Sequence, residues 1–429
     1  MKTKALKNRL SQFLGTEKGL LAMSAIVALY AFVYQITIGE YIYTDTESYF
    51  QAYESLTNGN IDIYRTPTYP LFIGSIRAII AEPYCYIIIL LIQIIIFLFS
   101  VHFFYRLTGL IKNTQIAYWL TFIYGVVHII PTWTTVILTE SISISVSVFY
   151  IYYTIFAVKT KRPSKIWKSI ICLLILIMIR PSFIYLVPMS FFIYIILDWR
   201  KKEERKIIYN GLLGSIIIAT IFCGYCYQMK KSNGIFSPSA ISLVNNYWID
   251  RNNGSFDTNA IKDIELKVYA DSIQNSINIP YSEALLIIQN FGCERMNAAI
   301  NDSRKTIVGN VGDIMERTFK ASRDRYKMTT RVIPCMFFEM FTPNMGPYFL
   351  ILAIFMIYII FNIYKKKYIP WKSSFLFLFA FGCIIVSIIG GPSDFGRLFM
   401  PSYPAVLLLT GILIQMIKDK SFLKNEFEE

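Results

Sequence analysis

The stretch YTDTESY at residues 43–49 and the stretch RTPTYP at residues 65–70 stand between two long apolar segments. These segments, near residues 19–39 and 84–101, are long enough to cross the hydrocarbon core of a bilayer, which is about 30 Å thick. Acidic and basic groups between two membrane spans are costly unless they line a hydrated, functional surface. The stretch therefore predicts a membrane-embedded helical chain with a charged site at the end of its first span.

The composition is typical of a membrane protein. Of the 429 residues, 55% are hydrophobic and only 16% are charged, and the mean hydropathy is +0.47. A soluble domain carries about a quarter charged residues. Aromatic residues reach 16%, which suits the headgroup region of a bilayer and also the stacking of rings on sugars.

The net charge of +14 does not indicate a nucleic-acid partner. The basic residues cluster in short segments between apolar spans, as the positive-inside rule expects, and no basic patch interleaved with aromatic residues is present. With His102 and His128 as the two histidines, a histidine-based metal centre is nearly excluded. The seven cysteines show no framework spacing, although Cys293 and Cys335 are candidates for a disulfide. We expect no metal site and no resident cofactor, and leave the need for a divalent cation open.

Ten apolar segments are long or nearly long enough to cross a membrane. They lie near residues 19–39, 84–101, 115–131, 137–158, 168–180, 183–197, 208–227, 348–364, 373–390 and 400–417. Their number predicts an all-α polytopic membrane protein with about ten transmembrane helices.

The fifth and sixth of these segments are short, and Arg180-Pro181-Ser182 lies between them. One interpretation is a single long, kinked helix. We favour two short helices that meet at the break, because Pro181 lacks a backbone N–H donor and ends the first helix. Broken helices at membrane depth persist only where protein covers them or where they line a cavity. The break therefore indicates a cavity near the outer face.

Basic loops fix the orientation of the chain. With ten spans, the loops at residues 159–168, 200–206 and 365–372 lie on one side together with both termini, and the positive-inside rule makes that side cytoplasmic. A single helix over 168–197 would move the second basic loop to the outside. This mismatch is the main argument for two helices.

The span map divides the chain into three parts: an N-terminal transmembrane module at 1–227 with a first outer loop at 40–83, an extracytoplasmic helical domain at 228–347, and a C-terminal transmembrane module at 348–429. Within the outer domain, helices are expected over 263–277 and over 282–300, with Ser282 as a plausible N-cap. The mixture of basic and apolar positions over 304–326 favours a helix on the membrane surface.

The acidic residues expected on the outer face each have a structural explanation as well as a functional one. Asp45 fits the N-cap of a helix that starts at Thr46. Glu47 and Glu140 fit the first turns of helices, where a carboxylate interacts well with the helix dipole.

The same choice exists for the other polar residues of this face. Arg65 either pairs with a nearby carboxylate or meets an anion. Arg180 interrupts apolar sequence and needs an anionic partner, either a lipid phosphate or a protein carboxylate. Arg397 has Asp394 as its obvious local partner, and Tyr69 fits the belt of aromatic residues at a membrane interface.

The spacing of Asp45, Tyr49 and the RTPTYP stretch resembles bacterial glycosyltransferases of the GT-C class, close to the protein mannosyltransferases and the lipid A aminoarabinose transferases. The Thr139-Glu140 start of a span, the Arg180-Pro181 break and the motif Arg397…Pro401…Pro404 also look like this group.

This resemblance is specific over residues 40–72 and absent over residues 228–347. The chain is shorter than many members of the class, and we expect no large C-terminal soluble domain in it. The acceptor therefore stays open, as a glycan, a lipid or a protein.

The resemblance implies a GT-C-like fold and the transfer of a sugar from a polyprenyl-phosphate donor to an acceptor hydroxyl on the outer face of the membrane. Asp45 matches the essential Asp of the class and is the expected base. The implied substrate-binding residues are Glu47, Arg65, Tyr69, Glu140, Arg180 and Arg397, with the arginines stabilising the phosphate leaving group. The expected location is the inner (plasma) membrane of a bacterium, with membrane lipids as further partners.

Two other kinds of protein fit parts of the pattern. A polysaccharide polymerase or O-antigen ligase has a similar number of spans and a large outer loop, but its expected signature includes histidine in that loop, and residues 228–347 contain none. A transporter of lipid-linked sugars would show two related halves and polar breaks near mid-membrane, and neither is evident.

Overall fold

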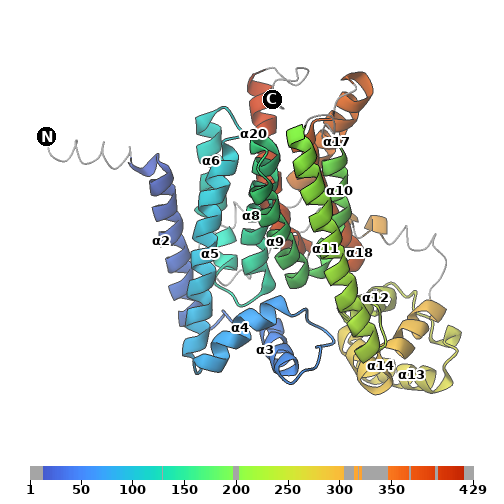
Figure 1. Cartoon of the computed structure of the whole chain (residues 1–429). Helices are drawn as coiled ribbons and strands as arrows, with labels where there is room; N and C mark the ends of the chain where they lie inside the picture. Colours follow the sequence, from blue (N-terminus) through green and yellow to red (C-terminus); the bar gives the residue numbers. More distant parts are fainter. Residues whose placement is uncertain are drawn as a thin grey trace.

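The computed structural model describes residues 13–127, 129–196, 202–303, 314–316, 318–320, 346–366, 369–391 and 395–419. Over these ranges the chain forms helices and connecting turns without a β-strand, so the predicted all-α class is confirmed. Figure 1 shows a bundle of long helices with α3 and α4 at one end, beside a smaller helical domain built by α12, α13 and α14.

Eight helical segments of the described chain are long and apolar enough to cross a membrane. They are formed by α2 (Glu17–Ile38), α5 (Tyr84–Thr108), α6 (Thr114–Gly125) with α7 (Ile129–Trp133), α8 (Thr139–Thr160), α11 (Lys202–Asn233), α17 (Gly346–Lys366), α18 (Trp371–Gly390), and α19 (Phe395–Phe399) with η3 (Met400–Ser402) and α20 (Tyr403–Lys418). Two shorter apolar segments lie between α8 and α11. Each of the ten expected spans therefore has a helical counterpart.

The two shorter segments are α9 (Pro163–Ile179) and η1 (Pro181–Tyr185), which continues into α10 (Leu186–Ile196). Arg180 separates them in an extended conformation, with φ −138° and ψ 102°. The start of α11 lies close to the start of α9, because Lys161 Nζ is 4.0 Å from Glu204 Oε1. The chain thus leaves one end of the bundle in α9 and returns to it in α10, as the two-helix interpretation requires.

The first loop is folded into two helices, α3 (Thr44–Thr57) and α4 (Thr68–Ile79). At the start of α3, the Thr46 hydroxyl accepts a hydrogen bond from the backbone N–H of Tyr43 at 2.9 Å. The same hydroxyl donates to the carbonyl of Ile137 at 3.0 Å, just before α8 begins. This contact holds the first turn of α3 against the first turn of α8.

Gln93 joins α4 and α5 to the segment that leads into α8. Its Oε1 atom accepts a hydrogen bond from the Tyr69 hydroxyl at 3.0 Å. Its Nε2 atom donates to the carbonyls of Thr134 and Val136 at 3.0 and 2.9 Å. Both side chains are buried, so these bonds form away from water, where an unpaired polar group is most costly.

The long helix α11 leads from the bundle into the smaller domain, whose elements are α12 (Ile241–Asn252), η2 (Thr258–Ala260), α13 (Ile264–Ser276) and α14 (Pro280–Ser303). With 32 residues, α11 is about 48 Å long, and the hydrocarbon core is about 30 Å thick. The domain has a hydrophobic core separate from that of the bundle, built around Leu243, Tyr247, Leu266, Ile287 and Met296.

The helices expected in this domain are present with small differences at their ends. Asp263 is the N-cap of α13, and its carboxylate accepts a hydrogen bond from the N–H of Leu266. Ser282 is not an N-cap, because α14 already begins at Pro280. Most of the surface helix expected over 304–326 lies outside the described residues, as does Cys335.

We expect Gln93→Leu to lower the free energy of unfolding by about 2–4 kcal/mol, because the variant removes three buried hydrogen bonds and leaves the carbonyl of Thr134 without its amide donor. The measurement is thermal unfolding of the purified protein in detergent. Gln35→Leu is the matched control. Gln35 is also fully buried, but its amide atoms have no hydrogen-bond partner among the described residues, so this variant should unfold at the same or a higher temperature. If Gln35→Leu lowers the unfolding temperature more than Gln93→Leu does, the hydrogen bonds of Gln93 do not stabilise the core as expected.

Candidate functional site

Charged side chains from distant parts of the sequence meet at the end of the bundle that carries α3. Asp45 lies in the first turn of α3, Glu140 in the first turn of α8, and Arg397 on the short helix α19. Arg65 comes from the segment between α3 and α4, and Arg180 from the break between α9 and η1. We call these five residues the ionic cluster.

Asp45 is held by two guanidinium groups. Arg65 Nη2 donates to Asp45 Oδ1 at 2.8 Å, and Arg397 Nη2 donates to Asp45 Oδ2 at 2.8 Å. Arg65 is fixed further by its Nε atom, which donates to the Ser48 hydroxyl at 2.8 Å, and by the Tyr49 ring, whose centroid lies 4.5 Å from the guanidinium carbon. Asp45, Ser48 and Tyr49 share one face of α3 because they are three and four residues apart.

Glu140 forms the second half of the cluster. Its Oε1 atom accepts hydrogen bonds from Arg397 Nε at 2.7 Å and from Arg180 Nη1 at 3.2 Å. The Glu140 side chain is only 1% exposed, so these two arginines compensate a carboxylate that water hardly reaches. Arg397 therefore bridges Glu140 and Asp45, and the cluster is continuous from Arg65 to Arg180.

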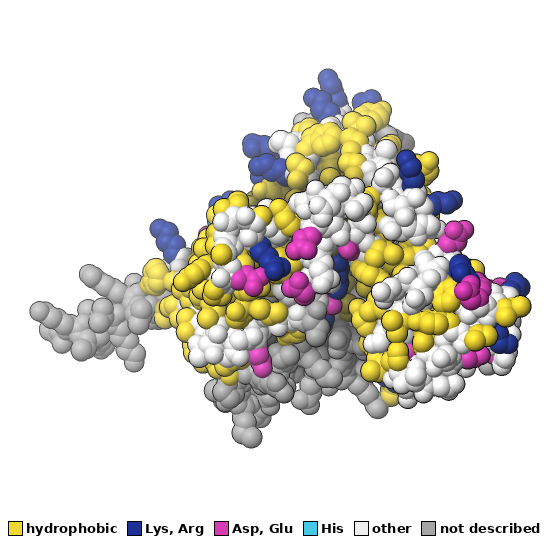
Figure 2. All heavy atoms as spheres, turned by 90° about the horizontal axis from the view of Figure 1, so that it is seen from below, with side chains coloured by type: hydrophobic (Ala, Val, Ile, Leu, Met, Phe, Trp, Pro, Cys, Tyr) yellow, Lys and Arg dark blue, Asp and Glu magenta, His cyan; other side chains and the backbone are white. Residues whose placement is uncertain are grey.

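The cluster carries a surplus of positive charge and is open at one side. Three guanidinium groups and two carboxylates leave a net charge of +1 over the five groups. The side chains of Asp45 and Arg397 are 26% and 24% exposed, so a ligand can reach them. From below, Figure 2 shows acidic and basic side chains between the part that contains α3 and α4 and the smaller domain. A partly open site of this charge suits an anionic group.

The electrostatic surroundings keep Asp45 ionised. Burial opposes its charge, but the attraction of Arg65 and then of Arg397, with their hydrogen bonds, prevails and holds the pKa of Asp45 below its usual value of 3.8. Asp45 is thus a carboxylate at neutral pH and, in this arrangement, a weak base.

Two of the residues expected from the sequence lie apart from the cluster. The side chain of Glu47 is 61% exposed and lies 3.9 Å from Arg77, not beside Arg65. Glu47 follows Asp45 by two residues, which turns it about 200° around the helix and away from the cluster. Tyr69 is buried and uses its hydroxyl for Gln93, so it packs beneath the site and does not line it. Its burial also differs from the expected place in an interfacial belt.

The local structural explanations have mixed outcomes. Asp45 is not an N-cap, because α3 begins at Thr44 and the residue before it takes the cap position. Glu140 lies in the first turn of α8, as expected, and also pairs with arginines. Arg180 has a protein carboxylate as its partner. Asp394 lies outside the described residues, and Arg397 binds Asp45 and Glu140.

The glycines before Arg397 have distinct positions. A Cβ atom on Gly391 would lie 2.5 Å from Leu398 Cδ1 and 2.7 Å from the Ser387 carbonyl oxygen, so this glycine allows the chain to fold back closely onto α18. The carbonyl of Gly390 accepts a hydrogen bond from Asn245 Nδ2 at 2.8 Å. That bond ties α12 of the smaller domain to the segment that leads to Arg397.

Sequence reasoning missed several residues that shape the site. Ser48 and Tyr49 were not singled out as supports for Arg65, although their spacing from Asp45 on a helix is a usable signal. Tyr281, at the start of α14, lies near enough to Arg65 and Asp45 for their charges to act on its hydroxyl. Its ring packs edge-on against Trp248 of α12 at a centroid distance of 5.9 Å. No short sequence motif indicates that Tyr281 of the smaller domain lies near the cluster.

Metal ligands do not gather in the described chain: no three His, Cys, Asp or Glu side chains come together there. The two carboxylates of the cluster have guanidinium partners instead. Tyr247 and Asp250 are buried in the smaller domain, so neither lines the ionic cluster.

No protein-family model matches the sequence, and no curated protein is significantly similar to it. Solved structures are similar in fold. The apo oligosaccharyltransferase of Archaeoglobus fulgidus matches with a TM-score of 0.51 and 11% sequence identity, over 96% of this chain and 52% of that protein. The oligosaccharyltransferase AglB of the same organism, in complex with an inhibitory peptide and a dolichol-phosphate, matches with a TM-score of 0.50 and 10% identity, over 96% and 51%.

This chain thus spans about half the length of the structures that it matches. At such low identity the similarity concerns the fold. The GT-C-like fold that the sequence predicted is therefore confirmed.

We expect Glu140→Gln to destabilise the folded protein by about 3–5 kcal/mol, because it leaves the charges of Arg180 and Arg397 without their shared buried carboxylate. Glu47→Gln is the matched control and should change stability by less than about 0.5 kcal/mol, because Glu47 is exposed and only weakly paired. Thermal unfolding in detergent measures both. Equal effects of the two variants would show that the Glu140 pairs contribute little.

Proposed function

We propose that this chain is a membrane glycosyltransferase that transfers a sugar from a polyprenyl-phosphate donor to an acceptor hydroxyl at the ionic cluster. The observation that carries the proposal is the sharing of Arg397 between Asp45 and Glu140, next to Arg65 and Arg180. The cluster combines an accessible carboxylate with cationic groups that suit a phosphate. The fold similarity supports the proposal as analogy, since fold alone does not fix an activity.

The phosphate of the donor is assigned to the arginines. A guanidinium group can donate two parallel hydrogen bonds to phosphate oxygens, and Arg397 is the partly exposed arginine at the centre of the cluster. One structure of similar fold contains a dolichol-phosphate, which is a lipid phosphate of the proposed class. The net positive charge of the cluster stabilises the negative charge that grows on the phosphate as the sugar leaves.

Asp45 is assigned to the acceptor. The bond between the anomeric carbon and the phosphate oxygen breaks, and its electron pair stays on the phosphate. The acceptor oxygen bonds to the anomeric carbon, and its proton passes to Asp45 and then to water. A carboxylate with two guanidinium partners is a weak base, so we infer that the donor phosphate draws Arg397 away and raises the basicity of Asp45. Transfer would then depend on prior donor binding.

The smaller domain supplies a second wall near the cluster. Trp248 and Tyr281 pack against each other there, and the hydroxyl of Tyr281 interacts electrostatically with Arg65 and Asp45. We assign the approach of the acceptor to this side, because aromatic side chains offer both an apolar face and a polar edge. The basic loops indicate that this end of the bundle faces outward, away from the cytoplasm.

The transporter hypothesis predicts a different outcome from the same preparation. Purified protein in liposomes should transfer radiolabel from a polyprenyl-phosphate sugar to an acceptor and release the lipid phosphate. Movement of the labelled lipid across the bilayer without its consumption would contradict the proposed activity. Supplying membranes with different labelled donors, one at a time, would identify the sugar and the acceptor.

Asp45→Asn should reduce transfer by at least about 100-fold, because the amide cannot take the acceptor proton. Size-exclusion chromatography and thermal unfolding should show that the variant is folded. Glu54→Gln is the control, since Glu54 is an exposed carboxylate of the same helix, and it should retain full activity. Full transferase activity of Asp45→Asn would remove Asp45 from the mechanism.

Arg397→Ala should lower kcat/KM for the donor by about 10- to 100-fold, which corresponds to the loss of charge-assisted hydrogen bonds to phosphate. The KM for the acceptor should change little. Arg77→Ala is the control, because Arg77 pairs with Glu82 at 2.8 Å, outside the cluster. Steady-state kinetics with the purified enzyme measure these values, and equal losses for donor and acceptor would indicate a structural role for Arg397.

A further inference from the structure

The central helix α8 is enclosed by other helices except at one strip. From residue 139 to residue 158, all side chains are buried apart from Phe149, Tyr153, Phe156 and Val158. The first three are spaced by four and three residues and therefore lie on one face. This strip is the part of the helix that membrane lipid can reach.

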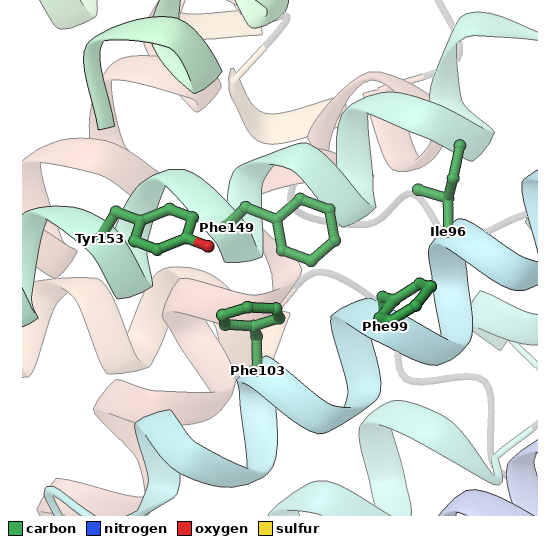
Figure 3. A pocket seen from close by; sticks show the side chains of 5 residues that line it. All are labelled: Ile96, Phe99, Phe103, Phe149 and Tyr153. Carbon is green, nitrogen blue, oxygen red and sulfur yellow. The ribbon is translucent and has the colours of Figure 1, made fainter. Parts of the chain in front are cut away.

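Part of this strip lines an apolar groove. The Phe103 ring of α5 packs against Phe149 and Tyr153 of α8 with centroids 5.2 and 5.6 Å apart. Together with Ile96 and Phe99 these rings line a shallow groove (Figure 3) of about 200 Å³. Ile96 and Phe103 are seven residues apart on α5, so the groove is about 10 Å long at a rise of 1.5 Å per residue. Its apolar lining suits a hydrocarbon chain.

The groove is separate from the ionic cluster. Phe149 follows Glu140 by nine residues, which places it roughly 180° around α8 on the opposite face. If the phosphate of the donor lies at the cluster, its lipid chain therefore does not lie in this groove. The groove needs an occupant of its own.

Two lysines at the start of α9 give the groove a charged end. Lys165 Nζ lies 5.5 Å and Lys168 Nζ lies 5.6 Å from the centroid of the Tyr153 ring. Among the residues that the structure describes, neither lysine has a carboxylate partner within salt-bridge distance. These amino groups stand at the end of the bundle that carries the basic loops, where an anionic headgroup would meet them.

We propose that the groove binds one anionic glycerophospholipid. One acyl chain packs along the aromatic side chains of α5 and α8, and the phosphate of the headgroup lies between Lys165 and Lys168. The lipid belongs to the leaflet at the basic end of the bundle, opposite to the leaflet from which the proposed donor would be used. By covering the strip, the lipid would seal the exposed side of the central helix.

The test uses the full chain in nanodiscs made of phosphatidylglycerol and phosphatidylcholine at a ratio of about 1:3, with both lipids carrying the same acyl chains. After extraction into mild detergent, native mass spectrometry measures which lipids stay bound. The wild type should retain one phosphatidylglycerol in clear preference to phosphatidylcholine. Lys165→Ala with Lys168→Ala should lower that preference by about fivefold for each lysine, from the typical attraction of one basic side chain to an anionic surface.

The control variant, Lys112→Ala with Lys418→Ala, removes the same charge from two exposed lysines that no cation–π contact joins to the groove, and it should retain the lipid. Phe99→Ser, at a residue that is 57% exposed, should weaken retention of both lipids, because it removes one side of the groove. Retention of phosphatidylglycerol by the first double variant would overturn the proposal. Bound lipids in the 1:3 ratio of the nanodisc would overturn it too, because they would show unselective annular lipid only. The measurement does not depend on transferase activity, so it stands apart from the proposed reaction.

Discussion

Arg397 bridges two carboxylates, and the arrangement of the ionic cluster depends on this contact. Its guanidinium reaches Asp45 of the first loop and Glu140 of the central helix. An arginine and a buried carboxylate beside a hydrocarbon layer are each costly when unpaired. Arg180 and Arg65 each already give one carboxylate a partner within the N-terminal half, so it is the charge of Arg397 that is compensated only when the C-terminal segment closes onto that half. The contact therefore joins the C-terminal segment to the N-terminal half at the ionic cluster.

Patterns of charge and hydropathy were sufficient for much of this architecture. The number of apolar segments, the break at Arg180 and the basic loops led to the correct bundle, because a bilayer leaves a chain few ways to satisfy its backbone. The five residues of the ionic cluster were singled out from the sequence, since charged groups next to long apolar segments are rare enough to stand out. Their mutual pairing was left open, because sequence does not give the distances between loops.

The errors have a common physical origin in helix geometry. A helix was expected to start at Thr46, but Glu47 was still grouped with Asp45, because the 200° turn between them was not considered. Tyr69 was grouped with surface residues although its partner Gln93, 24 positions away, draws it into the core. Short amphipathic helices outside the spans carry weaker signals than the spans themselves, and their buried faces depend on which neighbours they meet.

The length of α11 has a mechanical consequence for the enzyme proposed here. Because α11 is a continuous helix that crosses the bundle and enters the smaller domain, a change in its length both rotates and displaces that domain. Adding or removing one residue beyond the bilayer would swing that domain by about 100° and shift it by about 1.5 Å. Trp248 and Tyr281 would then face another direction, and the hydrogen bonds that join Ser239 and Ala240 to the segment before Arg65 would be strained or lost. The length of a helix that contributes no residue to the ionic cluster thus fixes, in whole-residue steps, the direction in which the smaller domain faces that cluster.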